Sequence, residues 1–250
     1  MLAPVVGTTS LSSRVSTKYL IVNADDFGQS PCVNRGIIEA HRRGIVTSAS
    51  LMVRWPAAPE AATYARDHPS LSLGLHVDLG EKTFRAGEWV PVYSVVPLQD
   101  MAAIAAEVSR QLDLFRRLTG CAPSHLDSHQ HVHLREPIRT VLIDVARQLG
   151  IPLRHCSPSV CYRGNFYGQT AEGAPLPDAI SVNGLIRILE TLPPGCTELG
   201  CHPADGCDLD TMYRGERLEE LRVLCDPRVR TALRARGIEL RSFKDFPNGH

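Results

Sequence analysis

The sequence predicts an α/β fold, in the form of an irregular, TIM-like (β/α) barrel of about seven strands. Three observations lead to this prediction. Short apolar runs typical of buried strands alternate with amphipathic stretches typical of helices, and this alternation favours a parallel sheet. The 250 residues suit one barrel, which commonly needs roughly 250. Acidic and histidine side chains follow several predicted strands, as they do on the C-terminal face where barrels carry their sites.

The first predicted strand, residues 19–26, is an apolar run that ends in two carboxylates. A helix at residues 33–43 follows, because Val33 and Ile37 recur at helical spacing and Gly44 ends it. The same unit then repeats along the chain. Further strands are predicted at residues 48–53, 71–79, 125–129, 151–156, 196–203 and 238–243. Further helices are predicted at residues 56–68, 100–118, 136–149 and 183–192, with one or two more between 213 and 236.

Two long stretches, residues 80–99 and 157–182, are rich in Gly, Pro and aromatic residues and are expected to be irregular loops. Loops at the C-terminal face of a barrel usually build its substrate site. No linker or repeat divides the chain, so residues 18–246 are expected to form one domain. Residues 1–17 lack the apolar segment of a secretory signal and are expected to form a flexible extension.

The bulk composition excludes several classes of partner. The chain has 27 basic and 27 acidic side chains, whereas proteins that bind nucleic acid usually carry a clustered basic excess. No apolar run approaches the roughly 20 residues that a membrane span needs. The eight cysteines are scattered without a CxxC pair, which indicates free thiols and a cytoplasmic location. A homodimer is one option that the sequence leaves open.

Polar side chains stand where several predicted strands end, and the carboxyl ends of parallel strands meet on one face of a barrel. Each pair has a plainer alternative, since adjacent acids often cap helices and a histidine within an apolar strand is often a core residue. Together they predict a shared site. The three pairs at these strand ends are Asp25 and Asp26, His76 and Asp78, and His202 and Asp205.

The stretch HLDSHQHVH, residues 125–133, places five ionisable groups at alternate positions, where an extended chain would line them along one face. A strand of about five residues ends near His129, so His131 and His133 are expected in the loop beyond it. His125 is expected to be a hydrogen-bonded interior residue. Asp127 is expected to orient an imidazole by accepting its free N–H.

Imidazole and carboxylate groups are the ligands that Zn and related divalent metals prefer, and three protein ligands mark a catalytic metal site. One aspartate and two histidines would form such a set. The sequence contains no GxSxG elbow, no Walker loop and no GxGxxG after a strand. These absences disfavour serine hydrolases, P-loop enzymes and dinucleotide-binding enzymes.

The motifs YLIVNADDFGQS, LGLHVDL, PSHLDSHQHVH and TELGCHPAD, in this order, resemble the YdjC-like family of carbohydrate deacetylases. The resemblance covers roughly residues 18–243. It implies a (β/α) barrel and one divalent metal ion, Zn or Mg in the first place, with Co, Ni or Mn as alternatives. It implies that Asp26, His76 and His129 hold the metal and that Asp25 is the catalytic base. It also implies that His202 lies near the substrate.

The expected substrate is a small N-acetylated amino sugar or oligosaccharide. The metal would polarise the acetyl carbonyl and lower the pKa of a water molecule, and Asp25 would accept the proton of that water. His202 or His131 would then protonate the departing amine. Residues expected to contact the sugar are His131, His133, Trp89 and Tyr167, and the aromatic residues among them have loop packing as an equal alternative.

Two other functions stay open at this point. A metal-dependent phosphoesterase would also use a barrel mouth rich in histidine and aspartate, commonly with two metal ions. A barrel that only binds a metal or a carbohydrate is the other option, because a fold does not guarantee an activity. Asp25 speaks against simple binding, which needs no base beside the metal ligands.

Overall fold

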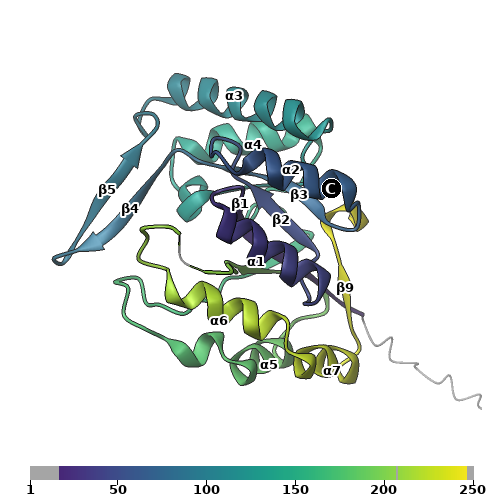
Figure 1. Cartoon of the computed structure of the whole chain (residues 1–250). Coiled ribbons are helices and arrows are strands. Elements are labelled where there is room, and N and C mark those ends of the chain that lie inside the picture. Colours follow the sequence, from purple (N-terminus) through teal and green to yellow (C-terminus); the bar gives the residue numbers. More distant parts are fainter. Residues whose placement is uncertain (1–16, 207, 247–250) are drawn as a thin grey trace, which may run out of the picture.

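The computed structural model describes residues 17–206 and 208–246. Its centre is a curled, seven-stranded parallel sheet in the order β6-β3-β2-β1-β8-β7, with β9 also paired to β1 (Figure 1). The predicted fold class is confirmed, as a barrel-like sheet whose path starts at β6 and ends at β7. The strands are β1 (Lys18–Phe27), β2 (Ser48–Leu51), β3 (Ser72–Val77), β6 (Leu126–Ser128), β7 (Val160–Arg163), β8 (Gly195–Cys201) and β9 (Ile238–Arg241).

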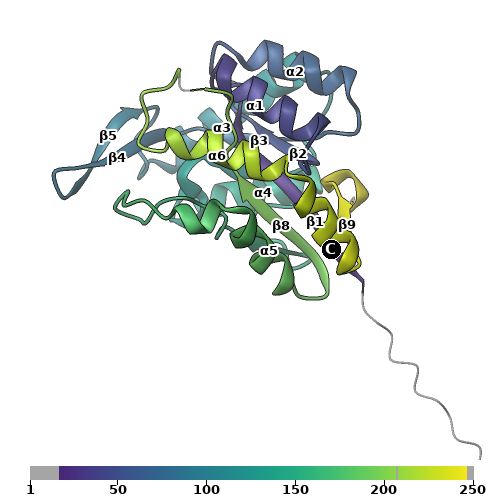
Figure 2. The same cartoon turned by 60° about the horizontal axis from the view of Figure 1, so that its bottom comes forward.

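Helices cover the outside of the sheet (Figures 1 and 2). Neighbouring helices pack on one another: α4 on α3, α3 on α2, α2 on α1 and α1 on α6, with α5 packed on α7. Among the described residues, these helices are too short or too polar to cross a membrane. They are α1 (Pro31–Arg42), α2 (Ala58–Asp67), α3 (Met101–Thr119), α4 (Ile138–Leu149), α5 (Val182–Glu190), α6 (Gly215–Leu224) and α7 (Pro227–Ala235), with short 3-10 turns η1 (His129–Leu134), η2 (Pro177–Ile180) and η3 (Phe243–Asp245).

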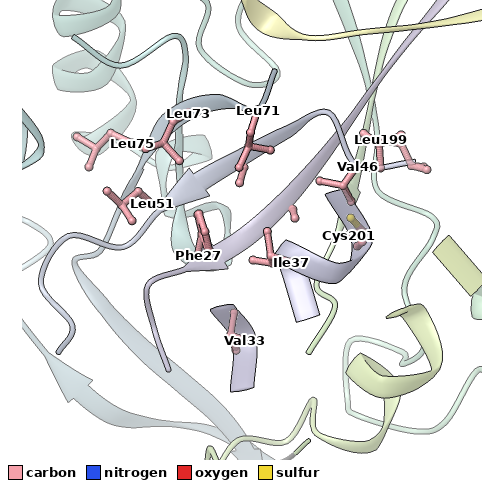
Figure 3. Close-up of a cluster of buried hydrophobic side chains, with 14 of the residues drawn as sticks. Phe27, Val33, Ile37, Val46, Leu51, Leu71, Leu73, Leu75, Leu199 and Cys201 are labelled. Carbon is pink, nitrogen blue, oxygen red and sulfur yellow. The ribbon is translucent and has the colours of Figure 1, made fainter. Parts of the chain in front are cut away.

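Strand β1 shows how side-chain alternation separates the apolar core from the interior of the barrel. Leu20, Val22 and Ala24 belong to the large core cluster between sheet and helices, part of which Figure 3 shows around Phe27 and Ile37. The alternate positions 21, 23 and 25 face the other way, because successive side chains of a strand point to opposite faces. The interior is therefore apolar at the start of β1 and polar where β1 ends.

The strand predicted at residues 151–156 is wrong in extent. Only one bridge forms there, between Leu153 and Leu126 of β6. Pro152 has no N–H to donate to a ladder, and His155 adopts a left-handed conformation with φ of 63° that ends the extended segment. The strand β7 forms a few residues later, inside the stretch that was expected to be irregular.

The stretch at residues 80–99 is also more regular than predicted, because it forms an antiparallel hairpin. Strand β4 (Gly80–Arg85) pairs with β5 (Glu88–Ser94). The turn residues Ala86 and Gly87 both have positive φ, at 52° and 87°, as the favoured two-residue hairpin turns require. Figures 1 and 2 show that the hairpin projects from the barrel as an arm.

The predicted N-terminal extension, residues 1–17, lies outside the described residues apart from Thr17. The assignment of residues 18–246 to one domain stays a prediction. The described cysteines are all free thiols, as expected.

Gly36 of α1 provides a test of how tightly the helices pack on the sheet. A Cβ atom at this position would lie 2.4 Å from the Cα of Ala204, which follows β8. Because backbone rather than a flexible side chain blocks the space, we expect Gly36→Ala to lower the free energy of unfolding by about 1–3 kcal/mol, measured by urea denaturation. Gly215→Ala is the matched control, since no atom lies within 4 Å of a Cβ there. Equal stability of the two variants would contradict the packing described.

Candidate functional site

Two adjacent carboxylates, Asp25 and Asp26, enter the interior together at the end of β1. In a regular strand they would point to opposite faces. Asp26 instead has a left-handed backbone with φ of 68°, and the register with β2 shifts between Ala24 and Phe27. Such a bulge re-aims a side chain. Both carboxylates are consequently buried and both line the same cavity.

Asp26, His76 and His129 form a compact group at the C-terminal end of the sheet. Asp26 Oδ1 lies 3.4 Å from His76 Nε2 and 3.1 Å from His129 Nδ1. One donor atom from each residue lies within 4.8 Å of the others, and all three side chains are buried. The pairing of β3 with β6 brings the two histidines together. The structure thus brings together the three residues that the family resemblance implies as metal ligands.

The donor set fits a divalent cation. It combines one carboxylate with two imidazoles, which are ligands typical of zinc and related ions. His129 Nε2 is buried without a hydrogen-bond partner. His76 Nδ1 lies 2.7 Å from Asp127 Oδ1, so Asp127 orients His76 as predicted.

Two buried arginines, which the sequence did not reveal as part of the site, each bind one of the adjacent aspartates. Arg217 of α6 donates to Asp26 Oδ2 at 2.6 Å, which leaves Oδ1 facing the histidines. Arg154 donates to both oxygens of Asp25 at 2.6 and 2.7 Å. Arg154 also reaches Asp127 at 2.8 Å. Arg217 therefore compensates Asp26, while Arg154 is shared by Asp25, Asp127 and the buried Glu198, which it reaches at 2.7 Å.

These contacts fix the charges of the site. Burial alone would raise the pKa of Asp26, but Arg217 and His129 hold it well below its usual range. Burial opposes ionisation of Asp25 in the same way, yet Arg154 lowers its pKa. Burial lowers the pKa of His76, but Asp127 and Asp26 raise it to about 10. His129 behaves alike, and Asp26 raises its pKa to about 9. Without a metal, both rings are therefore protonated on both nitrogens and positively charged at neutral pH.

His202 follows β8 and lies beside Asp25, with 3.8 Å between His202 Nε2 and Asp25 Oδ2. Its Nδ1 is 3.9 Å from Glu220 Oε1 of α6. Burial lowers the pKa of His202 to about 4 and raises the pKa of Glu220 to about 8. At neutral pH His202 is therefore uncharged and Glu220 is protonated, with the hydroxyl of Tyr213 also bonded to Glu220.

A cavity of about 580 Å³ opens over this group. The hairpin β4–β5 forms one wall with Trp89, and the loop around Tyr167 forms another. His131 also lines the cavity, whereas His133 does not; it is fully buried and its Nδ1 contacts the hydroxyl of Ser128 at 2.7 Å. Tyr167 packs edge-on against His202, with ring centroids 5.5 Å apart.

The remaining polar positions of the predicted strand ends are structural. His125 has both ring nitrogens bonded to serine hydroxyls and stacks on Phe243 at 3.8 Å, as predicted. Asp78 accepts from Arg54 at 2.9 Å and lies under the hairpin. Asp205 forms an exposed ion pair with Arg35.

Sequence reasoning missed Arg154, Arg217, Glu220 and the hairpin residue Glu81, which lies beside His129. Arg154 had a usable signal, since a single cation inside the apolar stretch IPLRHC needs a buried partner. Arg217 and Glu220 lie in a stretch dense in charge, which is indistinguishable from a solvated helix face without the fold.

Known proteins resemble this chain over almost its whole length. The family model described as YdjC-like protein matches residues 19–235. A carbohydrate deacetylase from Geobacillus stearothermophilus is 35% identical, covering 92% of this chain and 98% of the relative. A chitooligosaccharide deacetylase from Serratia marcescens is 33% identical, covering 92% and 99%. A solved structure from Enterococcus faecalis V583, provisionally described as a cellobiose-phosphate cleavage protein, is 28% identical with a TM-score of 0.74, covering 93% of this chain and 100% of that one.

The protonated histidines give metal binding a defined pH dependence. A cation needs the lone pairs of His76 and His129, so it must displace protons that are held with pKa values of about 10 and about 9. We expect the affinity for Zn²⁺ to rise as the pH approaches these values. Calorimetric titration at pH 7 in buffers of different ionisation enthalpy should show proton release. Binding without proton release would contradict this ligand set.

Proposed function

The chain belongs to the YdjC-like protein family, and from this premise we propose that it is a metal-dependent hydrolase that removes the acetyl group from an N-acetylated amino sugar or oligosaccharide. The observation that carries the proposal is the buried group of Asp26, His76 and His129 at the cavity, with Asp25 directly beside it. The relatives named carbohydrate deacetylase and chitooligosaccharide deacetylase support the reaction and the substrate class.

In this proposal Asp26, His76 and His129 hold one divalent ion. Two imidazoles favour zinc, with Co, Ni, Mn or Mg as alternatives. The ion would supply polarisation of the acetyl carbonyl and a water of lowered pKa. In a second candidate group, formed by Asp25, His76 and Asp127, both carboxylates already bind the guanidinium of Arg154. That cation argues against a second metal ion, and so against a two-metal phosphoesterase.

Asp25 is proposed as the general base. Its lowered pKa keeps it ionised at neutral pH, and Arg154 and Asn23 fix the orientation of its carboxylate. An acceptor held in one position needs no reorganisation when the water loses its proton. Asp25 also faces the cavity beside Asp26, where an attacking water would stand.

His202 is proposed as the group that protonates the departing amine. Because burial keeps it neutral in the resting protein, it must gain its proton during the reaction. In this scheme Asp25 takes up the proton of the water, and it lies 3.8 Å from His202, to which it can pass that proton. His131 is the alternative donor, but burial lowers its pKa to about 3, and its Nε2 already has the hydroxyl of Tyr162 at 3.4 Å.

The sugar is proposed to bind between the hairpin and the loop around Tyr167. Trp89 is 47% exposed at the cavity wall, and an exposed aromatic face suits stacking on a sugar ring. Tyr167 and His131 line the same cavity, and His133 packs edge-on against His131 with ring centroids 5.8 Å apart. The free thiols of the described chain fit a reducing compartment, so a cytoplasmic location is proposed.

Substitutions separate the base from the metal ligands. We expect Asp25→Asn to retain Zn²⁺ and to lose most activity, with kcat falling by roughly 10²–10⁴-fold, the usual contribution of general-base catalysis. We expect His129→Ala to lose both metal and activity. Metal content by mass spectrometry and acetate release measure the two effects. Full occupancy in His129→Ala would refute the ligand set, and wild-type activity of Asp25→Asn would refute the base.

The reaction itself is tested by acetate release from N-acetylated mono- and oligosaccharides with Zn²⁺, Mg²⁺, Co²⁺ or Ni²⁺ added. The proposal expects acetate and a free amine in equal amounts. A metal-loaded chain that releases no acetate from any of them would support simple carbohydrate binding, while release of phosphate from sugar phosphates would support a phosphoesterase.

A further inference from the structure

The two histidines of the proposed metal group differ in what holds their outer nitrogen. His76 turns Nε2 towards Asp26 and Nδ1 towards Asp127, at 3.4 and 2.7 Å. His129 turns Nδ1 towards Asp26 at 3.1 Å. Its Nε2 is buried and has no hydrogen-bond partner. Metal-bound histidines almost always donate their other N–H to a carboxylate, a carbonyl or water, so His129 lacks a group that His76 has.

The nearest acidic group to this nitrogen is Glu81, whose Oε2 lies 3.6 Å from His129 Nε2. Glu81 is the second residue of β4, at the base of the projecting hairpin. Its side chain is largely buried, at 11% exposure, although a glutamate on a hairpin arm is usually solvated. The hairpin thus directs a carboxylate inward, to the ligand nitrogen that has no hydrogen bond.

A second contact fixes the hairpin at this point. The side-chain amide of Gln130 accepts a hydrogen bond from Lys82 N at 2.9 Å and donates one to Lys82 O at 2.7 Å. Lys82 follows Glu81 directly and Gln130 follows His129 directly. The amide therefore joins the two segments one residue away from the gap between Glu81 and His129.

The backbone of this turn is strained. Gln130 and His131 both adopt left-handed conformations with φ of 51°, which side chains other than glycine rarely do. Each such residue costs of the order of 1 kcal/mol or more and persists only where the surroundings enforce it. In this conformation the amide of Gln130 lies against the backbone of Lys82.

We propose that Glu81 is a positioning residue, which accepts the Nε2–H of His129 so that Nδ1 is presented to the metal, and that Gln130 holds the hairpin in the position where Glu81 can do so. The inference rests on the proposed metal site. In it, the two ligand histidines have matching outer carboxylates, Asp127 from the sheet and Glu81 from the arm. The arm that walls the substrate cavity is then also a part of the metal site.

The first test is the affinity for Zn²⁺ of the full chain without substrate, by competition with a chelator. We expect Glu81→Ala to weaken binding by roughly 10–100-fold, the usual effect of removing an outer carboxylate. Glu81→Gln should lose less, because its amide oxygen still accepts an N–H. Glu88→Gln, on the exposed part of the same hairpin, is the control and should bind as the wild type does. Wild-type affinity in Glu81→Ala would overturn the inference, and so would equal losses in the Ala and Gln variants, which indicate a direct ligand.

The second test asks whether Gln130 acts through Glu81. Gln130→Ala should weaken zinc binding in the wild-type chain and add little in the Glu81→Ala background. Independent, additive losses would overturn this part of the inference. Circular dichroism of the metal-free variants checks that each is folded. If Gln130→Ala does not fold, the Glu81 variants still test the role of Glu81.

Failure of the proposed function gives a different result. A wild-type chain that binds zinc but releases no acetate would contradict the deacetylase proposal and leave the role of Glu81 intact. An active wild type with unchanged zinc affinity in Glu81→Ala would overturn only the role of Glu81.

Discussion

The burial of two adjacent aspartates is the constraint on which the rest of the site depends. An unpaired buried carboxylate is strongly destabilising, because a charge taken out of water needs a partner. Arg154 meets this need for Asp25 and Arg217 meets it for Asp26. Arg154 lies 129 residues after Asp25, and Arg217 lies 191 residues after Asp26. The site is therefore complete only when both halves of the barrel are in place.

The same arginines separate the roles of two chemically identical side chains. Arg217 takes one oxygen of Asp26 and leaves the other facing two imidazoles, which suits a metal ligand. Arg154 takes both oxygens of Asp25 and holds them at the cavity, which suits an oriented proton acceptor. A carboxylate pair that reads as one motif in the sequence thus becomes two groups with different tasks. The difference is set by partners that are distant in sequence.

The sequence was sufficient to predict what depends on local pattern. Apolar runs located most strands, and the expected length of the strand in HLDSHQHVH separated the interior His125 and Asp127 from His131 and His133 in the loop beyond it. It was insufficient wherever a contact is made across the fold. The hairpin was missed because Pro91 interrupts β5 and the turn uses Ala86 rather than Asn or Asp. Arg154 was assigned to a strand that Pro152 prevents, although its side chain is a centre of the site.

The account rests on one ion held by Asp26, His76 and His129. Anomalous diffraction at the zinc edge, from crystals of the zinc-loaded chain, tests this most directly because it locates every bound ion without reference to activity. The account predicts a single peak per chain, within bonding distance of these three side chains. A peak between Asp25 and Asp127, or two peaks per chain, would contradict it.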